Sequence, residues 1–279
     1  MLAELAERDA TGGIARIYEE IRRCCAVPYV SSMQRHLATR PGWLEWVWAA
    51  LRPAFSSGRA QTAAWRVSER LEVPALAPIS REALAVWGVD APALTSIAAA
   101  CDSFVRVSPV NLVLAGLLRR LLRGERPNGV DGANGEGDTG WAPPPPLPAL
   151  PGMVDAAALP PAERAVLASL GTTVDGEPFV PGLYRMLARW PGLLAHLATV
   201  LRPYLDDVGM LAAQARLAEA IDAEVPAVFA ALPALRPQPP EPEPAGIPAV
   251  VAALDTYRVT SPQLCVLGRM IRRALPLDG

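Results

Sequence analysis

The side chains that could do chemistry are few in this chain, and the cysteines are examined first. Cys24 and Cys25 are adjacent while Cys101 and Cys265 stand alone, so there is no CxxC motif and no spacing suited to zinc. This pattern is typical of reduced, buried thiols. The sequence therefore predicts no disulfide framework, no metal site and no cofactor.

The two histidines are the next candidates, because imidazole is the usual general base near neutral pH. His36 and His196 each fall inside an apolar helical pattern, where a packed or surface histidine is the more frequent outcome. We expect neither to be a catalytic base.

Arginine supplies the whole of the basic charge. Arg119-Arg120 and Arg272-Arg273 close apolar helical stretches, where cations interact favourably with the helix end, so we interpret them as solvated helix termini. Arg66 with Glu69, and Arg216 with Glu219, have the i,i+3 spacing of local ion pairs.

Composition excludes several classes of protein. The chain has 51% hydrophobic residues and a formal charge of −2, so it can bury a core and has no basic stripe for nucleic acid or an anionic membrane. The start MLAELAERDA carries no signal sequence, and the most apolar stretch, 110–122, is interrupted by arginine before it could span a bilayer. We expect a cytoplasmic protein.

An internal repeat organises the chain. Residues 27–55 align without gaps on 177–205 with 11 identities over 29 positions, including Pro41-Gly42 on Pro191-Gly192. After a three-residue insertion near 236–244 the register resumes, with Asp102 on Asp255 and Ser108-Pro109 on Ser261-Pro262. Each half is therefore a complete unit.

The repeat predicts the fold class and the domains. Apolar residues recur at helical spacing between prolines that mark helix ends, and no long alternating strand pattern is present. We therefore expect an all-α protein. The units are residues 1–123 and 153–279, joined by a Gly/Pro-rich solvated linker, 124–152. We expect the two units to pack about a pseudo-twofold axis as an intrachain pseudo-dimer, and a homodimer of the whole chain stays open.

A pocket between the two units would be the natural binding site. Helices that begin near Ser31 and near Pro181-Gly182 occupy equivalent positions in the repeat, so both N-termini can reach one central cavity. Their exposed N–H groups favour an anion, which predicts a small carboxylate ligand.

The stretch DATGGIARIYEEIRRCCAVPYV (9–30), followed by LATRPG, resembles the opening of the group I, non-stereospecific 2-haloacid dehalogenases, also called halocarboxylic acid dehalogenases. LARWPGLL and the later LRP resemble the same family in the second half. The resemblance implies an all-helical pseudo-dimer that hydrolyses 2-haloalkanoic acids to 2-hydroxy acids with inversion. In that family a carboxylate activates a water, which attacks the halogen-bearing carbon directly.

The residues that carry this chemistry in the family are mostly replaced here. Its catalytic Asp corresponds to Leu183, counted seven residues back from Trp190, and its neighbouring Ser corresponds to Gly182. An aromatic pocket residue corresponds to Tyr29, a second aromatic to Ser32, and an Asn to Ser108. These positions are the expected substrate-binding residues.

Other residues could supply the missing groups. Glu177 is a candidate substitute base, with Asp175 close by, although Pro178 and Pro181 separate both from the helix start. Asn111, one turn beyond Ser108, could replace the amide. A fainter resemblance to the carboxymuconolactone decarboxylase and alkylhydroperoxidase unit is disfavoured in its peroxidase branch, which needs CxxC.

Two functions follow from these observations. The first is a 2-haloacid dehalogenase-like hydrolase with its activity in question because Leu183 cannot accept a proton. The second is a non-catalytic scaffold that binds a small carboxylate or a partner in the same cavity. A carboxylate or histidine pointing into the cavity would favour the first.

Overall fold

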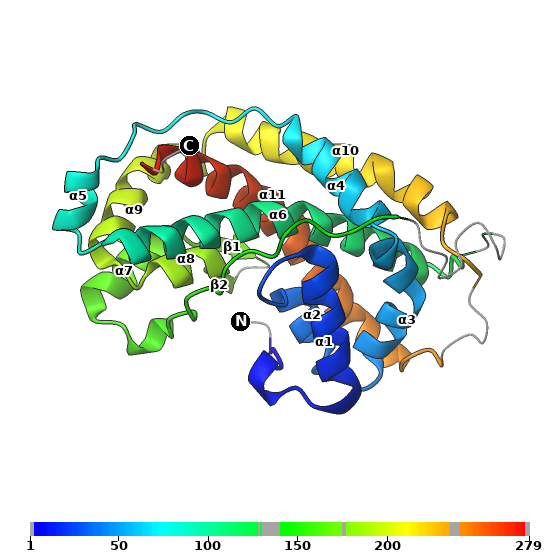
Figure 1. Cartoon of the computed structure of the whole chain (residues 1–279). Helices are drawn as coiled ribbons and strands as arrows, with labels where there is room; N and C mark the ends of the chain where they lie inside the picture. The colour runs from blue at the N-terminus through cyan, green and yellow to red at the C-terminus, as the bar shows by residue number, and fades with distance from the viewer. Residues whose placement is uncertain (1–2, 128, 130–139, 175–176, 235–239, 277–279) are drawn as a thin grey trace.

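The chain folds almost entirely into α-helices, as the sequence predicts (Figure 1). The computed structural model describes residues 3–127, 129, 140–174, 177–234 and 240–276. The helices of the first half are α1 (Gly12–Cys25), α2 (Ser32–Leu37), α3 (Trp43–Ser56), α4 (Arg59–Glu69), α5 (Arg81–Val86) and α6 (Ala91–Leu122), after the 3-10 turn η1 (Glu7–Asp9).

The second half has a similar order of helices, with a short hairpin before its second helix and a 3-10 turn in place of α5. It comprises η2 (Ala156–Ala158), α7 (Pro161–Ser169), strands β1 (Thr172–Val174) and β2 (Glu177–Phe179), α8 (Gly182–Leu187), α9 (Pro191–Leu205), α10 (Val208–Ala230), η3 (Pro244–Gly246) and α11 (Ile247–Ala274). The repeated sequences thus form α2 with α3 in one half and α8 with α9 in the other.

Two long helices, α6 and α11, pack against each other through the middle of the molecule, and the shorter helices surround them (Figure 1). Asp90 caps α6 by accepting a hydrogen bond from the Ala93 N–H at 2.8 Å. α6 is the one described helix long and apolar enough to cross a membrane, yet 83% of its most apolar stretch is buried inside the protein. Its hydrophobicity is therefore accounted for by the core.

The two halves exchange contacts reciprocally. The turn before α6 reaches across to α9, where Trp87 stacks on His196 with ring centroids 4.7 Å apart. The turn before α11 reaches back to α3, where Gly246 lies against the Trp43 indole. A pseudo-twofold relation would produce this exchange, and that relation itself stays a prediction.

The arginines that close α6 and α11 are not simply solvated, which corrects the interpretation from sequence. Arg119 pairs with Asp255 at 2.5 Å, and Arg272 pairs with Asp102 at 2.9 Å. Arg66 likewise pairs with Glu224 of α10 at 2.5 Å, and not with the local Glu69 that the sequence suggested. Each of these arginines pairs with a carboxylate on a helix of the other half of the chain, so the ion pairs link the two halves.

Two further expectations need correction. The sequence suggested no strand, but β1 and β2 form a two-stranded antiparallel hairpin in which Thr172 pairs with Phe179. The linker was expected to be solvated along its length, but Leu147 and Leu150 pack against the core and Arg106 donates to the Pro145 carbonyl at 3.0 Å. Residues 130–139 of the linker lie outside the described part of the chain.

The prediction of reduced, buried thiols is confirmed. Cys24, Cys25, Cys101 and Cys265 are all free and buried. Burial raises the pKa of the Cys25 and Cys101 thiols to about 12, because a thiolate there would lose its hydration.

Candidate functional site

A small cavity lies where the starts of α2 and α8 come together with α11. It measures about 30 Å³, which is room for roughly one water molecule. Its lining residues are Glu4, Ser32, Met153, Pro178, Phe179, Val180, Gly182, Arg185 and Tyr257. Both repeat copies therefore contribute to one cavity, through Ser32 in the first and Gly182 in the second.

Glu4 is the carboxylate of this cavity. It forms an ion pair with Arg35 at 2.7 Å, and its side chain keeps 24% of its exposure. Since Arg35 is on α2, the ion pair fixes the carboxylate beside that helix, whose first residue, Ser32, also lines the cavity.

The backbone around Glu4 is held by hydrogen bonds to two helices. The Leu5 N–H donates to the Arg35 carbonyl at 3.0 Å, and His36 Nδ1 donates to the Ala3 carbonyl at 2.8 Å. Tyr18 Oη donates to the Leu5 carbonyl at 3.1 Å. These bonds give His36 a structural role, because a carbonyl can only accept and the ring nitrogen must therefore carry the proton.

The other polar groups of the cavity are one cation and two hydroxyls. Arg185, the repeat equivalent of Arg35, lines the cavity and donates from Nε to the Val154 carbonyl at 3.4 Å. Ser32 and Tyr257 are hydrogen-bonded to each other, and burial raises the pKa of the Tyr257 phenol well above its ordinary value. Tyr257 therefore stays protonated and can donate a hydrogen bond.

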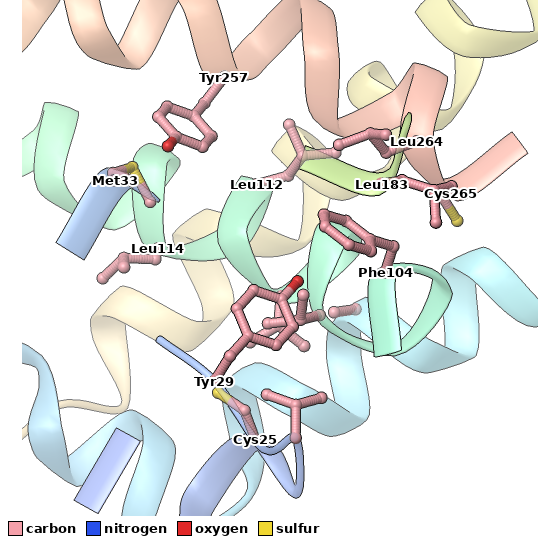
Figure 2. Packing of buried hydrophobic residues seen from close by; sticks show 14 of the residues in the cluster. Cys25, Tyr29, Met33, Phe104, Leu112, Leu114, Leu183, Tyr257, Leu264 and Cys265 are labelled. Carbon is pink, nitrogen blue, oxygen red and sulfur yellow. The ribbon is translucent and has the colours of Figure 1, made fainter. Parts of the chain in front are cut away.

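Leu183 is completely buried and lies behind the cavity, not on its wall. It belongs to an apolar cluster with Phe104, Leu264 and Cys265 (Figure 2). A carboxylate at this position would be surrounded by hydrocarbon, so the position reserved for the base in the resembling family is here part of the core.

Close packing explains why residue 182 is a glycine. A Cβ on Gly182 would lie 2.7 Å from Met153 Cε and 3.2 Å from Phe104 Cζ. Met153 thus takes the space that a serine at position 182 would need.

The remaining expected pocket residues do not line the cavity. Tyr29 is buried and stacks at a tilt on Phe104, with ring centroids 5.4 Å apart (Figure 2). Ser108 is buried in α6. Asn111 is engaged elsewhere, since its Oδ1 accepts from Ser31 Oγ at 3.3 Å and from Gln34 Nε2 at 3.4 Å. Of the five expected residues, the structure brings Ser32 and Gly182 to the cavity.

Neither Glu177, the candidate substitute base, nor His196, the second histidine, contributes a described side chain to the cavity wall. Glu177 opens β2, and its side chain lies outside the described part of the structure, as does Asp175. His196 stacks on Trp87, and burial lowers its pKa. Among the described residues no three His, Cys, Asp or Glu side chains gather closely enough to hold a metal ion.

Sequence reasoning missed Glu4, Arg185 and Tyr257. Arg185 and Tyr257 were visible as repeat partners of Arg35 and Phe104, and Glu4 belongs to an acidic start that showed no motif. The structure shows a parallel, since Leu5 donates to Arg35 as Val154 donates to Arg185. This pairs Glu4 with Met153, and a comparison of the first residues of the two units could have drawn attention to the carboxylate.

The fold is that of a known group of helical enzymes. Among solved structures, a mutant of a D-2-haloacid dehalogenase in complex with D-2-CPA is similar, with a TM-score of 0.73 and 19% identity over 99% of this chain and 96% of that one. Another mutant structure of a D-2-haloacid dehalogenase has a TM-score of 0.72, 19% identity and 99% and 96% coverage. A D-2-haloacid dehalogenase in complex with L-LA has a TM-score of 0.72, 19% identity and 99% and 97% coverage.

These similarities show the fold along nearly the whole chain. No family model matches the sequence, and neither does any curated protein. The chain thus has the haloacid dehalogenase fold, while the group I, non-stereospecific assignment rests on the sequence resemblance.

Proposed function

We propose that this protein is a 2-haloacid dehalogenase-like hydrolase in which Glu4, and not residue 183, activates the water. The observation that carries this proposal is the Glu4 carboxylate on the wall of the cavity between α2 and α8. A carboxylate in that cavity is the feature that separates a hydrolase from a binding scaffold on this fold. We further propose a cytoplasmic location and no cofactor.

The reaction requires one water and one base. Glu4 accepts a proton from the water, the water oxygen attacks C2 of the acid, and the carbon–halogen bond breaks with inversion as halide departs. The proton then passes from Glu4 to solvent, leaving a 2-hydroxy acid. The cavity has room for about one water, and a general base must lie within hydrogen-bond reach of that water.

Two other groups would orient the substrate. Arg185 supplies the charge that an acid's carboxylate would pair with. Tyr257, held by its hydrogen bond to Ser32, supplies a hydroxyl for the departing halide or for the substrate carboxylate. Fixed donors of this kind stabilise developing negative charge without reorganising.

The substrate itself needs more room than the closed cavity offers. A three-carbon haloacid is several times larger than one water, so part of the wall has to move. Met153 is the best candidate, because its flexible thioether contacts the Gly182 position. We propose that its side chain swings away when the acid enters.

Chloride release from each enantiomer of 2-chloropropionate tests the proposal. We expect slow release by the native protein and a fall in kcat of about 10²- to 10⁴-fold in Glu4→Gln, the usual contribution of a general base. Glu19→Gln, on the exposed side of α1, is the matched control and keeps native activity. Circular dichroism verifies that both variants fold.

Two outcomes would contradict the proposal. Undiminished release by a folded Glu4→Gln variant would exclude Glu4 as the base. Binding of 2-chloropropionate without release by the native protein would instead establish the non-catalytic scaffold.

A further inference from the structure

A second charged site lies between α6, α10 and α11 and shares no residue with the cavity. It is a groove of about 370 Å³, lined by Gly116, Arg119, Arg120, Arg123, Asp222, Val225, Pro226 and Arg258. The volume falls within the range of small-molecule sites. We call it the arginine groove.

The arginine groove carries a net positive charge in a chain whose net charge is −2. Four guanidinium groups line it against one carboxylate, Asp222, which is paired with Arg258. Two carboxylates next to it, Asp255 and Glu125, pair with Arg119 and Arg120. Positive charge remains in excess after these pairs are formed.

Arg123 supplies the unpaired donors of the groove. Arg120 Nε also lacks a hydrogen-bond partner among the described residues, but it is buried and its guanidinium lies over the Phe229 ring, so it does not face a ligand. Arg123 is exposed, and within the described part of the chain no acceptor for its side chain is found. A guanidinium has five N–H donors and one carboxylate takes at most two of them, so the paired arginines also keep donors free.

The fold does not require all of these arginines. Arg119 and Arg120 recur as Arg272 and Arg273 in the second half, but the repeat equivalents of Arg123 and Arg258 are Pro276 and Val105. The two extra arginines therefore have no basic counterpart at the equivalent positions of the other half. A structural role common to both halves does not explain Arg123 and Arg258.

The shape of the groove suits a compact anion. α6 and α10 approach closely in the groove, where a Cβ on Gly116 would lie 2.5 Å from Val225 Cγ2. The groove thus combines the apolar side chains of Val225 and Pro226 with four guanidinium groups. Guanidinium forks match the oxygen spacing of phosphate groups and bind them through paired hydrogen bonds.

We propose that the arginine groove binds a small molecule carrying a diphosphate group. Two adjacent phosphates supply enough acceptors and charge to engage Arg123 and the remaining N–H donors of Arg258 together, while Arg119, Arg120 and Arg258 keep their carboxylate partners. This site is independent of the hydrolase proposal, because the groove and the cavity share no lining residue.

Titration calorimetry of the full chain with inorganic pyrophosphate is the test, with ADP as a second probe for a nucleotide source and citrate as a control anion. We expect pyrophosphate to bind. Arg123→Gln should raise the dissociation constant of pyrophosphate about tenfold, because one charge-assisted hydrogen bond is lost. Arg16→Gln, an exposed α1 variant, should leave binding unchanged. Arg123 is exposed, so its substitution does not threaten folding.

The result can overturn the proposal in three ways. Absence of binding by both phosphate probes at millimolar concentration excludes the site. Equal affinity for citrate excludes diphosphate as the ligand class. An equal loss of affinity in Arg123→Gln and Arg16→Gln places the bound anion elsewhere on the surface. Tighter binding of ADP than of pyrophosphate would support the groove and identify a nucleotide as its source of diphosphate.

Discussion

Arg272 near the end of α11 holds Asp102 of α6 at 2.9 Å, and its repeat equivalent Arg119 near the end of α6 holds Asp255 of α11 at 2.5 Å. Each helix therefore offers an arginine to the acid of the other. The pairs share no residue and lie on equivalent positions of the repeat. This is the pattern that an isologous contact between two like units produces.

Removing either arginine should have a small and similar effect on stability. All four side chains keep between 26% and 55% of their exposure, so we expect Arg119→Gln and Arg272→Gln each to lower the free energy of unfolding by roughly 0.5 kcal/mol. The double variant should lose about the sum, because the pairs are independent. Urea denaturation measures all three, with Arg123→Gln as the control. Markedly unequal single effects would argue against the pseudo-twofold relation.

Much of the fold could be predicted from sequence because its signals are local. The positions of the prolines and the helical spacing of apolar residues predicted helix starts near Ser31 and Gly182. In the structure α2 begins at Ser32 and α8 begins at Gly182. The hairpin was missed because each strand has only three residues, too few for an alternating pattern. Residues 147 and 150 were assigned to a solvated linker because Pro and Gly surround them, yet both pack on the core.

The cavity could not be predicted in the same way. Glu4 reaches it through hydrogen bonds between residues 3–5 and α2, which are contacts across about 30 positions of sequence. Leu183 showed that the expected base was absent, but only tertiary packing shows that its side chain is turned into the core. Met153 contacts Gly182 because two segments separated in sequence run side by side.

Shortening Met153 should open the cavity. Met153→Ala removes the side chain that lies against Gly182 and Phe104, so we expect tighter binding of 2-chloropropionate and faster chloride release. The loss of packing should cost about 1–2 kcal/mol, since Met153 is only partly buried. Met210→Ala on α10, a buried methionine outside the cavity, should lose stability without a gain in activity. An unchanged KM in a folded Met153→Ala variant would mean that another part of the wall moves.

The buried thiols make stability depend on pH in the alkaline range. Burial raises the pKa of Cys25 and Cys101 to about 12 and that of Cys265 to about 11. An unfolded cysteine ionises near pH 8.5, so this contribution is complete below that pH and is lost as the pH rises toward 11 to 12. The urea midpoint should therefore fall between pH 8 and pH 10, and less so in Cys101→Ala. A thiol reagent at pH 8 should label the protein only after unfolding, and rapid labelling of the native protein would contradict the burial.

Leu183→Asp should not restore an efficient enzyme. The native side chain is fully buried beside Phe104, Leu264 and Cys265, so an aspartate there loses its hydration and its pKa rises above the ordinary value near 3.9. We expect a loss of about 3 kcal/mol of stability near neutral pH. Because the folded pKa is the higher one, the destabilisation is smallest below about pH 4 and grows as the pH rises toward that raised pKa.

Leu183→Asn is the matched control, because it has the same shape and does not titrate. Its destabilisation should stay constant with pH, so the difference between the two variants isolates the charge. Chloride release should rise only slightly in Leu183→Asp, since Leu183 does not line the cavity that holds the water. A large rise in chloride release that does not require Glu4 would show that the side chain at position 183 reaches the substrate. It would also show that the reaction does not depend on Glu4 as its base.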